Sequence, residues 1–197
     1  MDTCECVAAV VDQATQALVE ADPTLAQRVL DASTPEARLA GWHEATIAAL
    51  GGRRRPTAHD LCSAMAAVRA AVELDRLHDL AGEIAQTVLR HGTHPVLSGL
   101  LRQRFTDMGD IARRMTISAS CILYYGDPGY VDAVVAAEAE MDELHHSLFP
   151  VLATACQHGD GVNQVEAGLL SQFYEQYADH TVLLARQFAI TVAPSSR

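Results

Sequence analysis

The stretch Glu73-Leu74-Asp75-Arg76-Leu77-His78-Asp79 recurs in outline 100 residues later, as Phe173-Tyr174-Glu175-Gln176-Tyr177-Ala178-Asp179. Both stretches place two acids four residues apart. A second landmark, Asp22-Pro23, recurs 105 residues later as Asp127-Pro128. Two landmarks that repeat in the same order and at nearly the same offset indicate an internal repeat, so we expect the chain to consist of two similar halves.

Apolar residues recur at helical spacing along six segments, which we expect to be α-helices. These segments cover about 4–20, 24–50, 57–90, 97–125, 130–157 and 163–191. A bend is expected at 33–36 and a kink at Pro150, because proline interrupts helical hydrogen bonding. No segment has a convincing β-strand pattern. The sequence therefore predicts an all-α fold of two tandem three-helix bundles, at 1–92 and 96–192, related by a pseudo-symmetric repeat.

Composition excludes several classes of protein. The 197 residues are 49% hydrophobic but only 5% aromatic, which favours a helical core. A net charge of -11 argues against nucleic acid as a partner. No apolar stretch is long enough to span a membrane and no signal peptide is recognisable, so we expect a cytoplasmic protein. The five cysteines form no CxxC pair, which excludes a zinc knuckle and makes a disulfide framework unexpected.

Pairs of acids are the candidate functional residues. Acids four residues apart share one face of a helix, about 6 Å from each other, and repel unless something positive lies between them. The candidate metal ligands are Asp75, Asp79, Glu138, Asp142, Glu175 and Asp179. If the second and third helices of the second half pack face to face, the carboxylates of Glu138, Asp142, Glu175 and Asp179 converge. His146 or His180 then lies nearby. Such a set suits a divalent cation or iron.

The first half lacks one of these pairs. Ser33 and Ala37 stand where the second half has Glu138 and Asp142, so any metal is expected to prefer the second half. A solvated acidic helix face and a scaffold without ligand are the alternatives, as is a di-metal enzyme built on the second-half acids with His146. The chain has no nucleophile triad, phosphate loop or dinucleotide fingerprint, so we expect neither catalytic residues nor an organic cofactor.

In these motifs the sequence resembles the PhoU family, in its actinobacterial form, over nearly the whole chain. Family members typically read Glu-Leu-Glu-Arg-Ile-Gly-Asp at 73–79 and Arg-Gln-Pro-Thr-Ala-x-Asp-Leu near 55–61. Asp142-Glu143-Leu144 is similar to their Asp-x-x-Tyr. His78 and Ala178 replace two family glycines. Family chains usually begin earlier, so the first helix is expected to be truncated.

The resemblance implies a function. PhoU proteins are non-enzymatic regulators that couple the phosphate ABC transporter ATPase to a sensor histidine kinase and repress the phosphate-starvation response. It implies a homodimer that meets the membrane only indirectly, through these partners. Metal binding varies between family members. A carboxylate-rich metal-binding protein or a di-metal enzyme is the alternative reading of the same residues.

Overall fold

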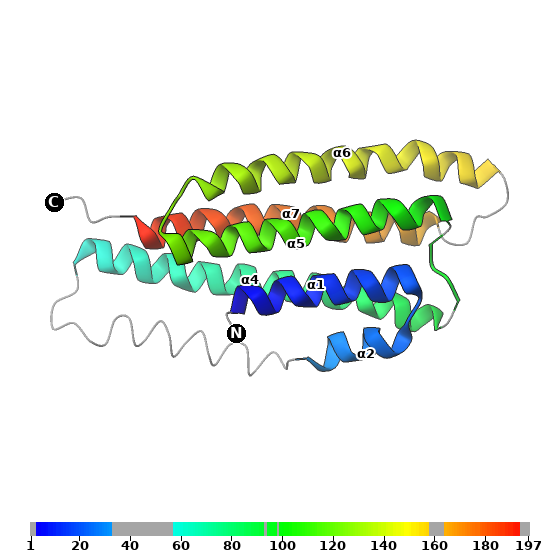
Figure 1. The fold of residues 1–197 in the computed structure, drawn as a ribbon, viewed down its shortest axis with the longest axis horizontal. Helices are drawn as coiled ribbons and strands as arrows, with labels where there is room; N and C mark the ends of the chain where they lie inside the picture. The colour runs from blue at the N-terminus through cyan, green and yellow to red at the C-terminus, as the bar shows by residue number, and fades with distance from the viewer. Residues whose placement is uncertain (1–2, 33–56, 93, 98, 158–163, 194–197) are drawn as a thin grey trace.

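The structure is a computed structural model that describes residues 3–32, 57–92, 94–97, 99–157 and 164–193. Within these ranges it contains six α-helices and no strand (Figure 1). The helices are α1 (Thr3–Glu20), α2 (Pro23–Asp31), α4 (Ala58–His91), α5 (Gly99–Tyr125), α6 (Tyr130–Gln157) and α7 (Gln164–Val192). The all-α prediction is confirmed.

Local signals fix the ends of these helices. Asp22 caps α2, because its carboxylate accepts hydrogen bonds from the backbone N–H groups of Thr24 and Leu25. Thr57 and Asp60 form the reciprocal capping box at the start of α4. Pro150 lies inside α6, which continues to Gln157. The predicted second helix is described only as α2; its remainder, with the expected bend, Ser33 and Ala37, lies outside the described residues.

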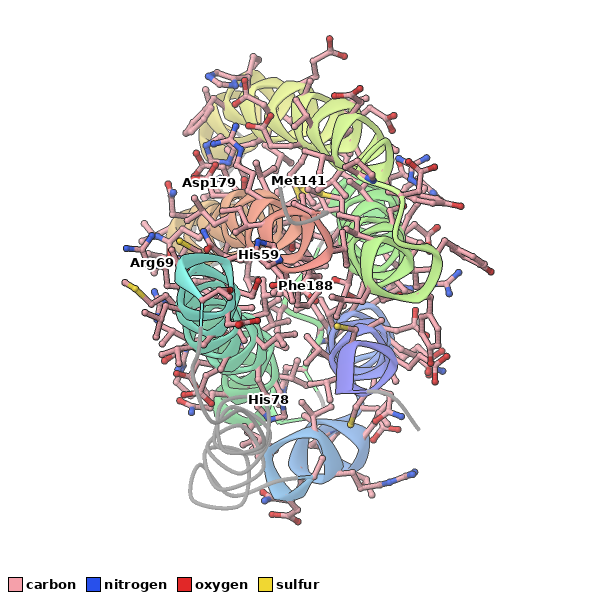
Figure 2. All side chains as sticks on the ribbon, turned by 90° about the vertical axis from the view of Figure 1, so that its left-hand side faces the viewer. His59, Arg69, His78, Met141, Asp179 and Phe188 are labelled. Carbon is pink, nitrogen blue, oxygen red and sulfur yellow. The ribbon has the colours of Figure 1, made fainter. Side chains whose placement is uncertain are left out.

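The helices pack as two groups of neighbours. In one group α1, α2 and α4 contact one another, and in the other α5, α6 and α7 do so. Two further contacts, α4 with α7 and α1 with α5, join the groups (Figures 1 and 2). This arrangement agrees with the predicted tandem bundles. Their boundaries, 1–92 and 96–192, stay a prediction.

One hydrophobic core runs through both groups. It joins buried side chains from all six helices, including Leu18 of α1, Leu77 of α4, Phe105 of α5, Met141 of α6 and Tyr177 of α7. No helix in the described ranges is both long and apolar enough to cross a membrane. Four of the five cysteines, Cys4, Cys6, Cys62 and Cys121, are free thiols.

Two buried tyrosines of α7 hold the centre of this core. The hydroxyl of Tyr174 is 2.8 Å from Thr15 Oγ1 on α1, and that of Tyr177 is 2.9 Å from Thr116 Oγ1 on α5. Both phenols are fully buried, and burial raises their pKa well above the usual range. Polar groups buried this deeply need partners, so α7 fixes the positions of α1 and α5 by hydrogen bonds as well as by packing.

At Gly109 the helix α5 packs tightly against Thr15 of α1. A side-chain carbon at this position would lie 2.3 Å from Thr15 Cγ2, which is well inside van der Waals contact. Glycine therefore allows the two backbones to come together beside the Thr15–Tyr174 hydrogen bond.

Candidate functional site

The packing of α6 on α7 brings together four of the six candidate ligands. Burial raises the pKa of Glu138, and Asp179, Asp142 and Glu175 raise it further in that order. Arg186 opposes them and lowers it. Because each of these three acids acts on the same carboxyl, the four form one electrostatic cluster, which we call the second-half acid cluster.

The second-half acid cluster opens to solvent. Asp142 and Asp179 are exposed, whereas Glu138 and Glu175 are partly buried. Asp142 Oδ1 lies 3.0 Å from Nδ1 of His146, one helical turn further along α6. Glu175 accepts a hydrogen bond from Gln172. The cluster is thus a surface feature of α6 and α7 and is not enclosed.

Of the two alternative histidines that the sequence suggests, only His146 accompanies this cluster. His146 pairs with Asp142, but His180 turns to α4, where its Nδ1 lies 2.6 Å from Oε2 of Glu73. A third histidine, His145, is buried, with Nδ1 2.5 Å from Ser171 Oγ on α7. Its role in holding α6 against α7 has no counterpart among the sequence predictions, since a buried histidine follows no spacing rule.

The first-half pair stands apart from the second-half acid cluster. Asp75 is partly buried and Asp79 is exposed on α4, and neither is among the groups that shift the pKa of Glu138. The described part of the chain contains no group of three or more histidine, cysteine, aspartate or glutamate side chains placed to hold a metal ion. The metal site on these six residues therefore stays a prediction.

The contact between α4 and α7 contains polar pairs that the sequence did not indicate. Arg76 Nη2 donates to Gln176 Oε1 at 3.2 Å. The Glu73–His180 pair lies on one side of it, and a pair between His91 and Glu166 lies on the other. Along α4 the three residues run in the order Glu73, Arg76, His91, whereas their partners on α7 run in descending order from His180 through Gln176 to Glu166. The helices α4 and α7 are therefore antiparallel (Figure 1).

Known proteins resemble this chain along most of its length. It is 31% identical over 187 residues to the phosphate-specific transport system accessory protein PhoU homolog 2 of Mycobacterium tuberculosis, covering 94% of this chain and 87% of that protein. The chain belongs to the PhoU family. It is also 30% identical to PhoU homolog 1 of Mycobacterium leprae, covering 94% of this chain and 84% of that protein. No protein-family model matches the chain.

Solved PhoU structures have the same fold. The crystal structure of PhoU from Pseudomonas aeruginosa aligns with a TM-score of 0.83 at 19% identity, covering 96% of this chain and 91% of that one. The phosphate transport system regulatory protein PhoU from Streptococcus pneumoniae aligns with a TM-score of 0.78 at 16% identity, covering 94% and 87%. The PhoU fold is therefore retained although few residues are shared.

Proposed function

We propose that this PhoU protein is a non-enzymatic accessory regulator of phosphate uptake. The observation that carries the proposal is its 31% identity, over 94% of the chain, to proteins named as accessory to the phosphate-specific transport system. Its place of action is the cytoplasm, where it couples the phosphate ABC transporter ATPase to a sensor histidine kinase. Phosphate sufficiency is then signalled by repression of the starvation response.

Such an adaptor works by a shift of populations. It must bind one state of the transporter or of the kinase better than another, because a ligand with equal affinity for both states shifts nothing. The solvent-facing position of Asp142 and Asp179 supports this role over that of a metal enzyme. A metal enzyme needs an open coordination position and a pocket that holds substrate. Homodimer formation belongs to the same proposal.

Deletion of the gene in its host tests the proposal. We expect starvation genes to be expressed in phosphate-rich medium, and a plasmid copy to restore repression. Should those genes stay silent in a strain that has no second PhoU gene, the regulatory assignment is wrong.

A second function, cation binding, is favoured by one observation. Three acids raise the pKa of Glu138, so the second-half acid cluster carries repulsion that a divalent cation would relieve. We propose that this cluster is where a divalent cation or iron binds, with the acids of α6 and α7 as ligands.

A further inference from the structure

An exposed apolar surface lies on α4 and α7. Leu61, Met65, Val68 and Val72 follow one another at spacings of four, three and four residues along α4 and are 48% to 60% exposed. Leu183 and Ile190 of α7 are 40% and 45% exposed. Exposed apolar side chains at helical spacing are typical of a surface that binds another protein. We call these six residues the apolar patch.

The apolar patch is one surface because of how α4 and α7 pack. The two helices are antiparallel and meet at Arg76 and Gln176. Leu61, Met65, Val68 and Val72 precede Arg76, and Leu183 and Ile190 follow Gln176, so all six lie toward the same end of the molecule. Figure 2 places Arg69 of α4 and Asp179 of α7 on the same side of the bundle.

Charges of opposite sign adjoin the apolar patch. Arg69, between Val68 and Val72, is exposed. Asp179 and Glu175 of the second-half acid cluster lie next along α7 toward the middle of the molecule. At a rise of about 1.5 Å per residue, Asp179 lies roughly 6 Å and Glu175 roughly 12 Å beyond the level of Arg69. Arg69 thus lies within the apolar patch, and the acids of α7 begin at about the level of Val72, where the patch ends.

We propose that the apolar patch binds an amphipathic helix of a partner protein in phosphate signalling. The partner helix has an apolar side about three turns long, a carboxylate at the level of Arg69, and a lysine or arginine one or two turns further on, over Asp179 and Glu175. Leu61 and Val72 are roughly 17 Å apart along α4, which sets that length. The inference rests on the proposed function and names the surface through which it acts.

Two other occupants fit the charges less well. A two-fold axis through the apolar patch would bring Arg69 of one copy close to Arg69 of a second copy, and like charges across an interface disfavour binding. A membrane surface carries anionic lipids, which Glu138, Glu175 and Asp179 would repel. A partner helix with one acidic and one basic side chain pairs its acid with Arg69 and its base with Asp179 and Glu175.

Complementation in the deletion strain gives the first test. We expect Val68→Glu with Val72→Glu to lose repression, because the new carboxylates would be buried unpaired against the partner. The matched control is Leu123→Glu on α5, which is 39% exposed and outside the apolar patch, and it should repress normally. Cellular levels and thermal midpoints of both variants should equal those of the unaltered protein. Normal repression by the double variant overturns the inference and leaves the proposed function standing.

Photo-crosslinking gives a test that does not depend on repression. Met65 is replaced by benzoylphenylalanine in the full-length protein in its host, and the adduct is mapped to the peptide. We expect a helix with the acid and base described above, and Arg69→Glu should reduce the adduct at least about tenfold, the effect of about 1.4 kcal/mol in binding. Changing the partner's acid to arginine should restore it. Adducts only with a second copy, or no restoration by the charge swap, overturn the inference.

Discussion

Arg76 donates a hydrogen bond to Gln176, and these two residues hold equivalent positions in the two halves of the chain, 100 residues apart. When two related helices pack antiparallel, equivalent residues meet only where the local two-fold axis passes between them. The Arg76–Gln176 pair marks that point on α4 and α7. Glu73 and its partner His180 lie three residues before Arg76 and four after Gln176, as antiparallel packing about this point requires.

The buried hydroxyls predict an asymmetry between two mutants. Thr15 Oγ1 donates to the carbonyl of Val11, so Tyr174 must be the donor in their 2.8 Å hydrogen bond. Tyr174→Phe removes that donor and leaves Thr15 bonded to Val11, at a cost of about 1 kcal/mol in the free energy of unfolding. Thr15→Val leaves the buried hydroxyl of Tyr174 without an acceptor, and should lower the free energy of unfolding by about 1–3 kcal/mol. Urea unfolding measures both, and a larger cost for Tyr174→Phe than for Thr15→Val would contradict the assigned direction of the bond.

Two glycine-to-alanine changes should have opposite signs. At Gly109 the new carbon would lie 2.3 Å from Thr15 Cγ2, and we expect a loss of about 1–3 kcal/mol from the strain. At Gly168 of α7 nothing lies within 4 Å of the new carbon, so better helix propensity should add about 0.5–1 kcal/mol. Thermal unfolding compares the two variants directly. A stabilising Gly109→Ala would mean that α1 and α5 do not approach closely there.

The second-half acid cluster predicts a pH effect. The folded-state pKa of Glu138 is raised, so folding binds its proton more tightly, and stability from this group falls as pH rises through the carboxyl range. Asp179→Asn should move the pKa of Glu138 down toward its ordinary value, whereas Asp75→Asn should leave it unchanged. Carboxyl carbon-13 NMR titration of metal-free protein reads this pKa. An equal response to both changes would show that the cluster is not confined to α6 and α7.

Cation binding should also distinguish the halves. Glu175→Ala with Asp179→Ala removes half of the carboxylates of the cluster and should abolish binding of a divalent cation, because the remaining two acids attract it far less. Asp75→Ala with Asp79→Ala should change binding little. Elemental analysis after dialysis, with Fe²⁺ and Mn²⁺ added in turn, measures this. Equal losses from the two double variants would place the metal elsewhere.

Sequence patterns predicted the features of this molecule that depend on periodic spacing, and they missed the contacts between individual side chains. Helix bounds such as Tyr130–Gln157 followed from apolar spacing and from prolines and glycines, which act locally. The gathering of Glu138 with Glu175 followed from the repeat, because it requires only that α6 packs on α7.

Contacts between single residues depend on tertiary geometry that no local pattern encodes. His180 lies one residue after an acid pair and is one of the two alternative histidines that the sequence places near the metal, yet its side chain turns to Glu73 of α4. The direction of a side chain follows from the rotation of its helix against its neighbours. The 100-residue offset could have predicted the Arg76–Gln176 contact, but only once α4 and α7 were known to be antiparallel.

Because the two halves share one hydrophobic core, they should not fold separately when the chain is cut between them. Because α1 packs on α5 and α4 on α7, cleavage between the halves would leave each fragment with a broad apolar face that the other covers in the intact protein. Neither fragment should behave as an independent folding unit. Produced together from separate genes, the two fragments should instead reassemble, and only the reconstituted pair should melt in one cooperative step.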